Sequence, residues 1–148
     1  MTTSDTPIDK PPAIWNPNAA ACWCLLFTPA FGAFLHAQNA DTLGRAEEAK
    51  ANRIWFKISI AFLICILVSV LIPGIPDGIF RFAGLGLLFG WYFSVGKKQI
   101  IFVKSTWQDR YERKSWKQPL LIAFGCLVVS FIVSFALAVV AESIFDSK

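Results

Sequence analysis

Four cysteines and a single histidine are the side chains of this 148-residue chain best suited to metal or redox chemistry. Cys22 and Cys24 form a C-x-C pair, but side chains two residues apart on a helix point to opposite sides. That geometry suits neither a disulfide nor a shared metal ion. Cys65 and Cys126 stand in the middle of apolar stretches, where a buried thiol behaves as a small apolar side chain. We therefore expect no metal and no cofactor.

His36 is separated from Cys24 by roughly three helical turns, so the two residues do not predict a shared metal site. Two interpretations of His36 are open. Its imidazole handles protons near neutral pH, or the residue is simply an interfacial polar side chain at the C-terminal end of a helix. The adjacent carboxylates Glu47 and Glu48 stand among Lys and Arg, as on a solvated helix face. We find no Ser-His-Asp set and no phosphate-binding loop, which favours a protein that is not an enzyme.

The composition indicates that a lipid bilayer surrounds the elements that carry these residues. Apolar residues make up 55% of the chain and charged residues 16%, against about 25% charged in a typical soluble domain. Four apolar stretches approach the roughly 20 residues that a helix needs to cross the hydrocarbon. We predict an all-α polytopic membrane bundle, residues 15–148, that follows a mobile polar tail of residues 1–14. Its four membrane segments are residues 19–37, 54–72, 79–95 and 120–140.

The first apolar stretch is interrupted at its centre by Thr28-Pro29, and Gly32 follows. A proline within a helix removes one backbone hydrogen bond and clashes with the preceding turn. A membrane tolerates this only where other protein groups satisfy the freed backbone. The stretch is therefore either a kinked span or a re-entrant hairpin that folds around Pro29, and we favour the kinked span. Before it, Asn16-Pro17 predicts a helix start, with an asparagine cap and a proline at the first helical position.

Positive charges lie almost entirely on one side of this predicted bundle. The loops 38–53 and 96–118 together carry ten Lys and Arg, whereas the two tails carry one each and the Pro-Gly turn after residue 72 carries none. The positive-inside rule places both loops in the cytoplasm and the C-terminus outside. The N-terminal tail is outside if the first stretch spans the membrane, and inside if that stretch is re-entrant.

The second of these loops has the pattern of an amphipathic helix over about residues 99–117. Apolar side chains recur there every three or four residues, and charged residues fill the intervening face. We expect this helix to lie on the cytoplasmic leaflet and to attract anionic lipid head groups. Docking of a cytoplasmic partner is a further interpretation, and nucleic acid is not an expected partner beside membrane spans. The residues concerned are Lys104, Trp107, Arg110, Tyr111, Arg113 and Lys114.

Small residues four positions apart predict close helix packing. Gly86 and Gly90 form a G-x-x-x-G pair in the third apolar stretch, and such pairs let a second backbone approach closely. Ser130 and Ser134 repeat the spacing in the fourth stretch. We therefore expect these residues to pack against another helix, within the bundle or in a second copy of the chain.

The N-terminal part of the chain resembles the signature of a group of small, uncharacterised bacterial inner-membrane proteins. The resemblance covers about residues 15–56 and is carried by Trp15-Asn-Pro-Asn-Ala-Ala-Ala, Trp23, Leu25-Leu-Phe-Thr-Pro-Ala-Phe-Gly-Ala and Leu35-His36. It implies a bacterial inner-membrane location and supplies no activity. It also implies that one structural feature is formed by Asn16, Pro17, Thr28, Pro29, Gly32 and His36.

Two functional hypotheses follow from these patterns. The first is a non-enzymatic integral membrane protein that acts through contacts with another membrane protein or with itself. An immunity-type protein that blocks a membrane-targeting toxin is a narrower form of it. The second is a subunit of a small channel or transporter in which the broken first stretch lines the path, because unwound backbone at membrane depth is tolerated where it faces a cavity.

Overall fold

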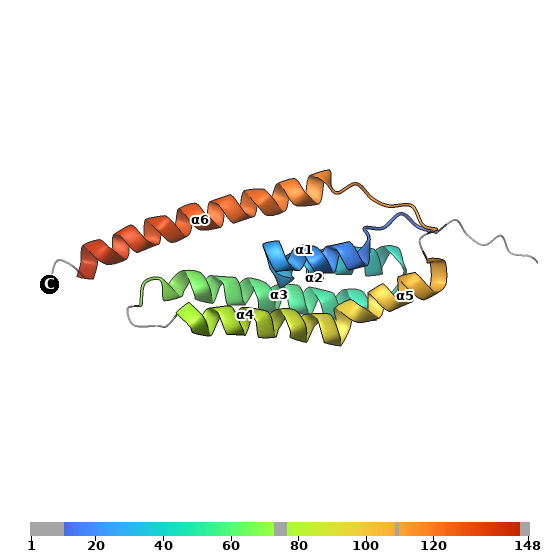
Figure 1. Ribbon diagram of the computed structural model, residues 1–148, viewed down its shortest axis with the longest axis horizontal. Coiled ribbons are helices and arrows are strands. Elements are labelled where there is room, and N and C mark those ends of the chain that lie inside the picture. Colours follow the sequence, from blue (N-terminus) through green and yellow to red (C-terminus); the bar gives the residue numbers. More distant parts are fainter. Residues whose placement is uncertain (1–10, 73–76, 109, 146–148) are drawn as a thin grey trace, which may run out of the picture.

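The all-helical architecture expected from the sequence is confirmed in the computed structural model, which describes residues 11–72, 77–108 and 110–145. Figure 1 shows the helices running side by side along one long axis. The elements are α1 (Pro17–Phe27), α2 (Pro29–Thr42), α3 (Ala46–Ser69), α4 (Asp77–Trp91), the π-helical turn η1 (Tyr92–Gly96), α5 (Lys97–Trp107) and α6 (Lys117–Phe145).

Three of these helices are long and apolar enough to cross a membrane. They are α3, the continuous helix Gly78–Trp107 formed by α4, η1 and α5, and residues Lys117–Ile144 of α6. The predicted segments 54–72, 79–95 and 120–140 fall on these three helices. The chain therefore has the architecture of a multi-pass membrane protein with three candidate spans. The predicted segment 19–37 is not one of them.

The first apolar stretch folds back on itself, so the kinked span that we favoured is wrong. The chain reverses at Thr28, whose φ of 123° takes the backbone out of the helical region. The two arms run antiparallel, since the His36 ring on α2 lies 3.0 Å from the Pro17 carbonyl oxygen at the start of α1. The arms have 11 and 14 residues, or roughly 16 and 21 Å, well short of the roughly 30 Å hydrocarbon thickness.

Helix α3 begins at Ala46, eight residues before the predicted segment at 54. The additional residues are mostly Ala, Glu, Lys and Arg, which favour helix even where they are polar. Ala49 and Asn52 on this extension are buried, and α3 makes its most extensive contacts with α2. The polar start of α3 therefore supports the hairpin instead of forming a separate loop.

The predicted amphipathic helix over 99–117 is correct only as far as Trp107, where α5 ends. Beyond Gln108, residues 110–116 form a non-helical linker whose backbone pairs with the N-terminal segment. The Ile14 amide donates to the Glu112 carbonyl oxygen at 3.1 Å, and the Lys114 amide donates to the Ile14 carbonyl oxygen at 3.0 Å. This pairing joins residues about a hundred positions apart, so the local apolar periodicity that predicted a longer helix does not report it.

The same pairing corrects the prediction of a mobile tail over residues 1–14. Ile14 is fully buried, and it packs with Val103 and Tyr111. Residues 1–10 of that predicted tail lie outside the described residues, as does most of the Pro-Gly turn, residues 73–76. Because the hairpin returns the chain to its starting level, residues 11–16 lie at the same end of the molecule as α5 and the linker.

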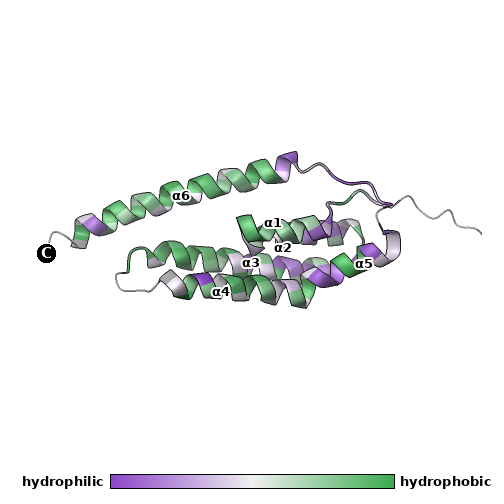
Figure 2. Ribbon diagram, viewed as in Figure 1, coloured by the Kyte–Doolittle hydropathy of each residue, from purple (hydrophilic) through white to green (hydrophobic). Residues whose placement is uncertain are grey.

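Helix α6 stands apart from the rest of the molecule. Its contacts with the other helices are few and are mainly with α1 and α3, and Figure 1 shows it running along one side with the short hairpin between it and α3. Figure 2 shows α6 coloured as hydrophobic along most of its length, whereas hydrophilic residues gather around α5 and the base of the hairpin.

Candidate functional site

The largest group of buried polar side chains lies where the base of the hairpin meets α3, the end of α4 and α5. We call this group the hairpin clasp, and it consists of His36, Asn39, Asn52, Trp91 and Gln99. All five side chains are fully buried in the described structure. Buried polar groups are costly unless they are hydrogen-bonded, so their partners determine what the clasp does.

Asn39 and Gln99 tie three separate segments together. The Trp15 amide donates to Asn39 Oδ1 at 3.0 Å, and Asn39 Nδ2 donates back to the Trp15 carbonyl oxygen at 2.8 Å. Asn39 Nδ2 also lies 3.4 Å from Gln99 Oε1, while Gln99 Nε2 donates to the His36 carbonyl oxygen at 2.9 Å. One amide on α2 and one on α5 therefore hold the N-terminal segment, the hairpin and the end of the long helix in register.

His36 closes the base of the hairpin. Its Nε2 lies 3.0 Å from the Pro17 carbonyl oxygen, and because a carbonyl only accepts, this nitrogen carries the proton. The ring meets the Trp91 indole edge-on, with centroids 5.0 Å apart, and Nδ1 is buried without a hydrogen-bond partner among the described residues. Burial lowers the pKa of His36 to about 4, opposed by the bond to Pro17, so the imidazole is neutral at neutral pH.

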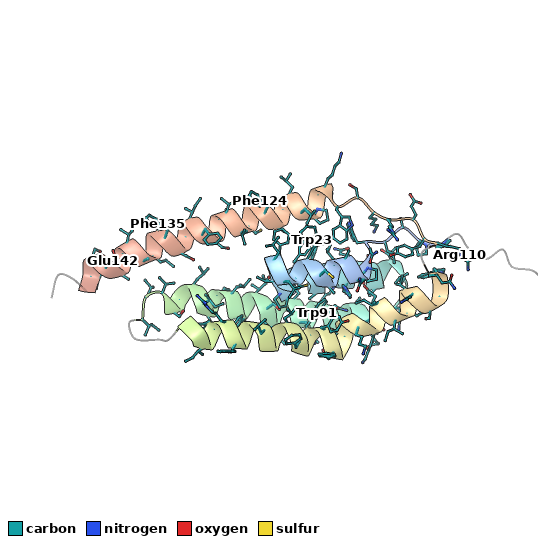
Figure 3. All side chains as sticks on the ribbon, viewed as in Figure 1. Trp23, Trp91, Arg110, Phe124, Phe135 and Glu142 are labelled. Atoms are coloured by element: carbon teal, nitrogen blue, oxygen red, sulfur yellow. The ribbon has the colours of Figure 1, made fainter. Side chains whose placement is uncertain are left out.

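Trp91 is the largest fully buried side chain and the centre of the apolar packing beside the clasp. Its indole N–H donates to Asn52 Oδ1 at 3.0 Å, and Asn52 Nδ2 donates to the Glu48 carbonyl oxygen at 2.9 Å. Two glycines make room for the ring. A Cβ on Gly32 would lie 2.8 Å from Trp91 Cη2, and one on Gly96 would lie 3.2 Å from the same atom. Trp91 is labelled at this position in Figure 3.

All the motif residues implied by the resemblance lie on the hairpin or its cap, at three different levels. Asn16 caps α1 as predicted, because its side chain accepts hydrogen bonds from the amides of Asn18 and Ala19 at 3.0 and 3.1 Å. Pro17 and His36 meet at the base. Gly32 lies midway against Trp91, and Thr28-Pro29 forms the tip.

Sequence reasoning missed four of the five clasp residues. Asn39 and Asn52 lie in the predicted loop 38–53, and Trp91 lies in the predicted membrane segment 79–95. Gln99 was taken as part of a surface helix. A signal was nevertheless present for three of them, because Asn39, Asn52 and Gln99 are uncharged amides in predicted loops that are otherwise rich in Lys and Arg. An amide can be buried when its hydrogen bonds are satisfied, whereas a charged side chain is rarely fully buried.

The residues expected to pack helices behave differently from one another. A Cβ on Gly90 would lie 3.1 Å from the Trp55 ring on α3, so this glycine does permit a close approach. Gly86 is exposed with open space around it. On α6, Ser130 is exposed and its hydroxyl donates to the Cys126 carbonyl oxygen of the same helix. The structure thus brings Gly90 into a close contact between helices of one chain, whereas Gly86 and Ser130 are exposed and Ser134 is half-buried on α6.

The basic residues of the second loop stay together at one end of the molecule, although not on one helix. Lys104 and Trp107 belong to α5, and the others follow on the linker, where Arg110 is labelled in Figure 3. Tyr111 is buried, so it is not an interfacial side chain. The Lys114 ammonium lies 4.5 Å from the centroid of the Trp15 ring.

A second feature lies at the opposite end of the hairpin. A groove with a volume of about 380 Å³ runs between the hairpin tip, α3 and α4, and we call it the tip groove. Thr28 and Pro29 line one end of it, and the walls are mainly Leu, Ile and Phe side chains of α3 and α4. Arg81 is the one charged side chain among the described residues that line it.

The hydrogen bonds of the clasp hold the N-terminal segment, the hairpin, α3 and α5 together. No group of three or more His, Cys, Asp and Glu side chains in the described segments is placed to hold a metal ion. All four cysteines are free thiols. The arrangement therefore fixes the hairpin against α3 and α5. Comparison of the chain with protein-family models, with curated proteins and with solved structures gave no match.

Proposed function

We propose that this chain is a small integral protein of a bacterial inner membrane that acts without catalysis, through contacts of α6 with another membrane protein or with a second copy of the chain. The supporting observation is that α6 is a spanning-length helix with almost no partner in its own chain: 6% of its most apolar stretch is buried. In such a bundle the hairpin, α3 and α4 form a fixed base. The linker, residues 110–116, holds the start of α6 against that base.

The face of α6 that carries the large aromatic side chains supports this assignment. Phe124, Phe131 and Phe135 are 58%, 69% and 73% exposed, and their spacing of seven and four residues places them on one side of the helix. Aromatic side chains are enriched where proteins meet, because each removes a large apolar area at low entropic cost. In a bilayer, lipid covers such a face unless a protein replaces it. Phe124 and Phe135 are labelled on α6 in Figure 3.

The orientation that accompanies this proposal follows the positive charges. The loops 38–53 and 96–118 face the cytoplasm in it, anionic head groups lie against the basic end, and the C-terminus is outside. The N-terminal segment is then cytoplasmic, since the hairpin returns the chain to the end at which it started. An immunity-type protein, which blocks a toxin that targets membranes, fits the same small and largely lipid-embedded architecture.

Photo-crosslinking within the native membrane tests the proposal. A benzophenone amino acid is introduced in place of Phe124, Phe131 or Phe135, and separately in place of Phe82 or Phe89, which are 78% and 54% exposed on α4. We expect the α6 positions to yield one protein adduct of constant mass and the α4 controls to yield only lipid adducts. A second copy of the chain as the adduct would also support the proposal. Lipid adducts alone at all three α6 positions would contradict it.

A second candidate function is favoured by the position of the broken first stretch. The Thr28-Pro29 break lines the tip groove, and non-helical backbone at membrane depth is tolerated where it borders a cavity. A channel or transporter subunit would use this break to line the path. Solute flux through proteoliposomes distinguishes the two functions. Flux that Thr28→Val abolishes would favour transport, and an inert protein that retains its α6 adduct would favour partner binding.

A further inference from the structure

The tip groove has the dimensions of a site for one lipid chain. On α4 it extends from Phe80 to Leu88, a rise of about 12 Å, close to the roughly 15 Å of hydrocarbon in one leaflet. Its walls are apolar side chains of α3 and α4, and the hairpin tip with Leu25, Leu26 and Pro29 forms its floor. Since the hairpin arms are too short to span, the groove lies in the half of the membrane that the hairpin does not reach.

One cation stands at the open end of this apolar groove. Arg81 lies one turn from the start of α4, about 6 Å along the axis from Asp77, which is the depth from which an arginine reaches the head groups. Its side chain is exposed. Apart from Asp77, four residues earlier, the α4 residues around it from Gly78 to Leu88 are apolar. A guanidinium at this level attracts a phosphate, to which it donates hydrogen bonds in a fixed fork.

We propose that the tip groove binds one anionic phospholipid, with its phosphate on Arg81 and one acyl chain lying along α3 and α4 to the hairpin tip. This site is at the opposite end of the molecule from the basic residues of α5 and the linker. It is therefore distinct from general attraction of that end to acidic lipid. The chemistry required of the ligand is one negative head group and one saturated or unsaturated chain of ordinary length.

One glycine leaves room for this occupant, and two residues nearby provide controls. Gly84 keeps the wall open, because a Cβ there would meet only Phe62 at 3.7 Å. Neither Lys57 nor Gly86 lines the groove, although both lie on the same two helices, so they serve as matched controls.

The test places the full-length protein in phosphatidylcholine vesicles that contain a small share of a photoactivatable lipid with a diazirine at the end of one chain. The probe is either phosphatidylglycerol or phosphatidylcholine with identical chains. Labelling is mapped by mass spectrometry on the peptide that contains the hairpin tip, residues 25–29. We expect the phosphatidylglycerol probe to label this peptide about fivefold more than the phosphatidylcholine probe, as for one basic residue at a lipid surface.

Variants separate the site from the surrounding lipid. Arg81→Gln should bring the ratio of the two probes to about one, and both Arg81→Lys and the control Lys57→Gln should keep it. Gly84→Phe, which fills the groove, should reduce labelling of the tip by both probes, whereas Gly86→Phe should not. A ratio of one in the unaltered protein, an unchanged ratio in Arg81→Gln, or equal labelling of every lipid-facing helix would overturn the proposal.

This inference does not depend on the proposed role of α6. Arg81 and the groove are on α3, α4 and the hairpin, so Arg81→Gln should leave the α6 adduct intact. Loss of the lipid preference with retention of that adduct would show that the two sites are separate.

Discussion

The imidazole of His36 is held neutral in a fully buried position, and this makes the clasp sensitive to acid. The pKa of His36 is about 4 in the folded protein and near 6.5 when the chain is unfolded. Because the folded state binds the proton less tightly, its stability is complete above pH 6.5 and falls as the pH decreases toward 4. We expect a loss of about 2 kcal/mol between pH 7.5 and pH 5.

Thermal unfolding in detergent at the two pH values measures this loss. His36→Gln provides the comparison, since the amide can still donate to the Pro17 carbonyl oxygen but does not titrate. The melting temperature of the unaltered protein should fall with acid by several degrees more than that of the variant. Equal shifts in both proteins would show that His36 does not carry the pH dependence.

The close packing around Gly32 leads to a second prediction for a single residue. A Cβ at this position would lie 2.1 Å from Cys24 Sγ and 2.8 Å from Trp91 Cη2, so α1 and α2 must separate to admit it. Gly32→Ala should destabilise the protein by about 1–3 kcal/mol, as overpacking does. Gly86→Ala, where the space is open, should be neutral or stabilising by up to about 1 kcal/mol because alanine favours helix. Thermal melts that rank the two variants in the reverse order would contradict this packing.

The hairpin replaces the membrane span predicted for the first apolar stretch, and the backbone at its tip is strained. Thr28 has φ 123° and ψ 161°, a region that is essentially restricted to glycine and costs about 1–3 kcal/mol for other residues. Thr28→Gly should therefore raise the stability of the folded protein by about 1 kcal/mol. Thr42→Gly, at the end of α2, should give no gain. The comparison uses thermal melts, and a loss of stability in Thr28→Gly would mean that the tip is not strained.

The elements differ in how far their sequence determines them. The long apolar helices and the Asn16 cap follow from composition and local pattern, and the structure confirms them. The reversal at Thr28-Pro29 does not, because a proline predicts a break without giving the direction in which the chain continues. Likewise, Asn39, Gln99 and the Ile14 backbone find their partners far along the chain, and no local periodicity encodes those contacts.

At the scale of the whole molecule, polarity separates along the long axis. The clasp, the linker and most of the basic residues gather at one end. Glu142, near the end of α6, lies at the opposite end of the molecule from Arg110, as Figure 3 shows. This division is typical of a bundle anchored by its polar end at one membrane surface. The short hairpin extends through only about half the depth of the bundle, and the tip groove lies in the other half.

The sidedness of the chain tests this arrangement directly. With three spans and a hairpin, residues 11–16 and the α2–α3 connection share one side, whereas a spanning first stretch would put them on opposite sides. In a chain whose four cysteines are replaced by alanine, Pro12→Cys and Leu43→Cys should react with an impermeant maleimide from the same side of sealed vesicles. Ser143→Cys, near the end of α6, should react from the other side. Labelling of Pro12→Cys and Leu43→Cys from opposite sides would restore the fourth span and remove the hairpin.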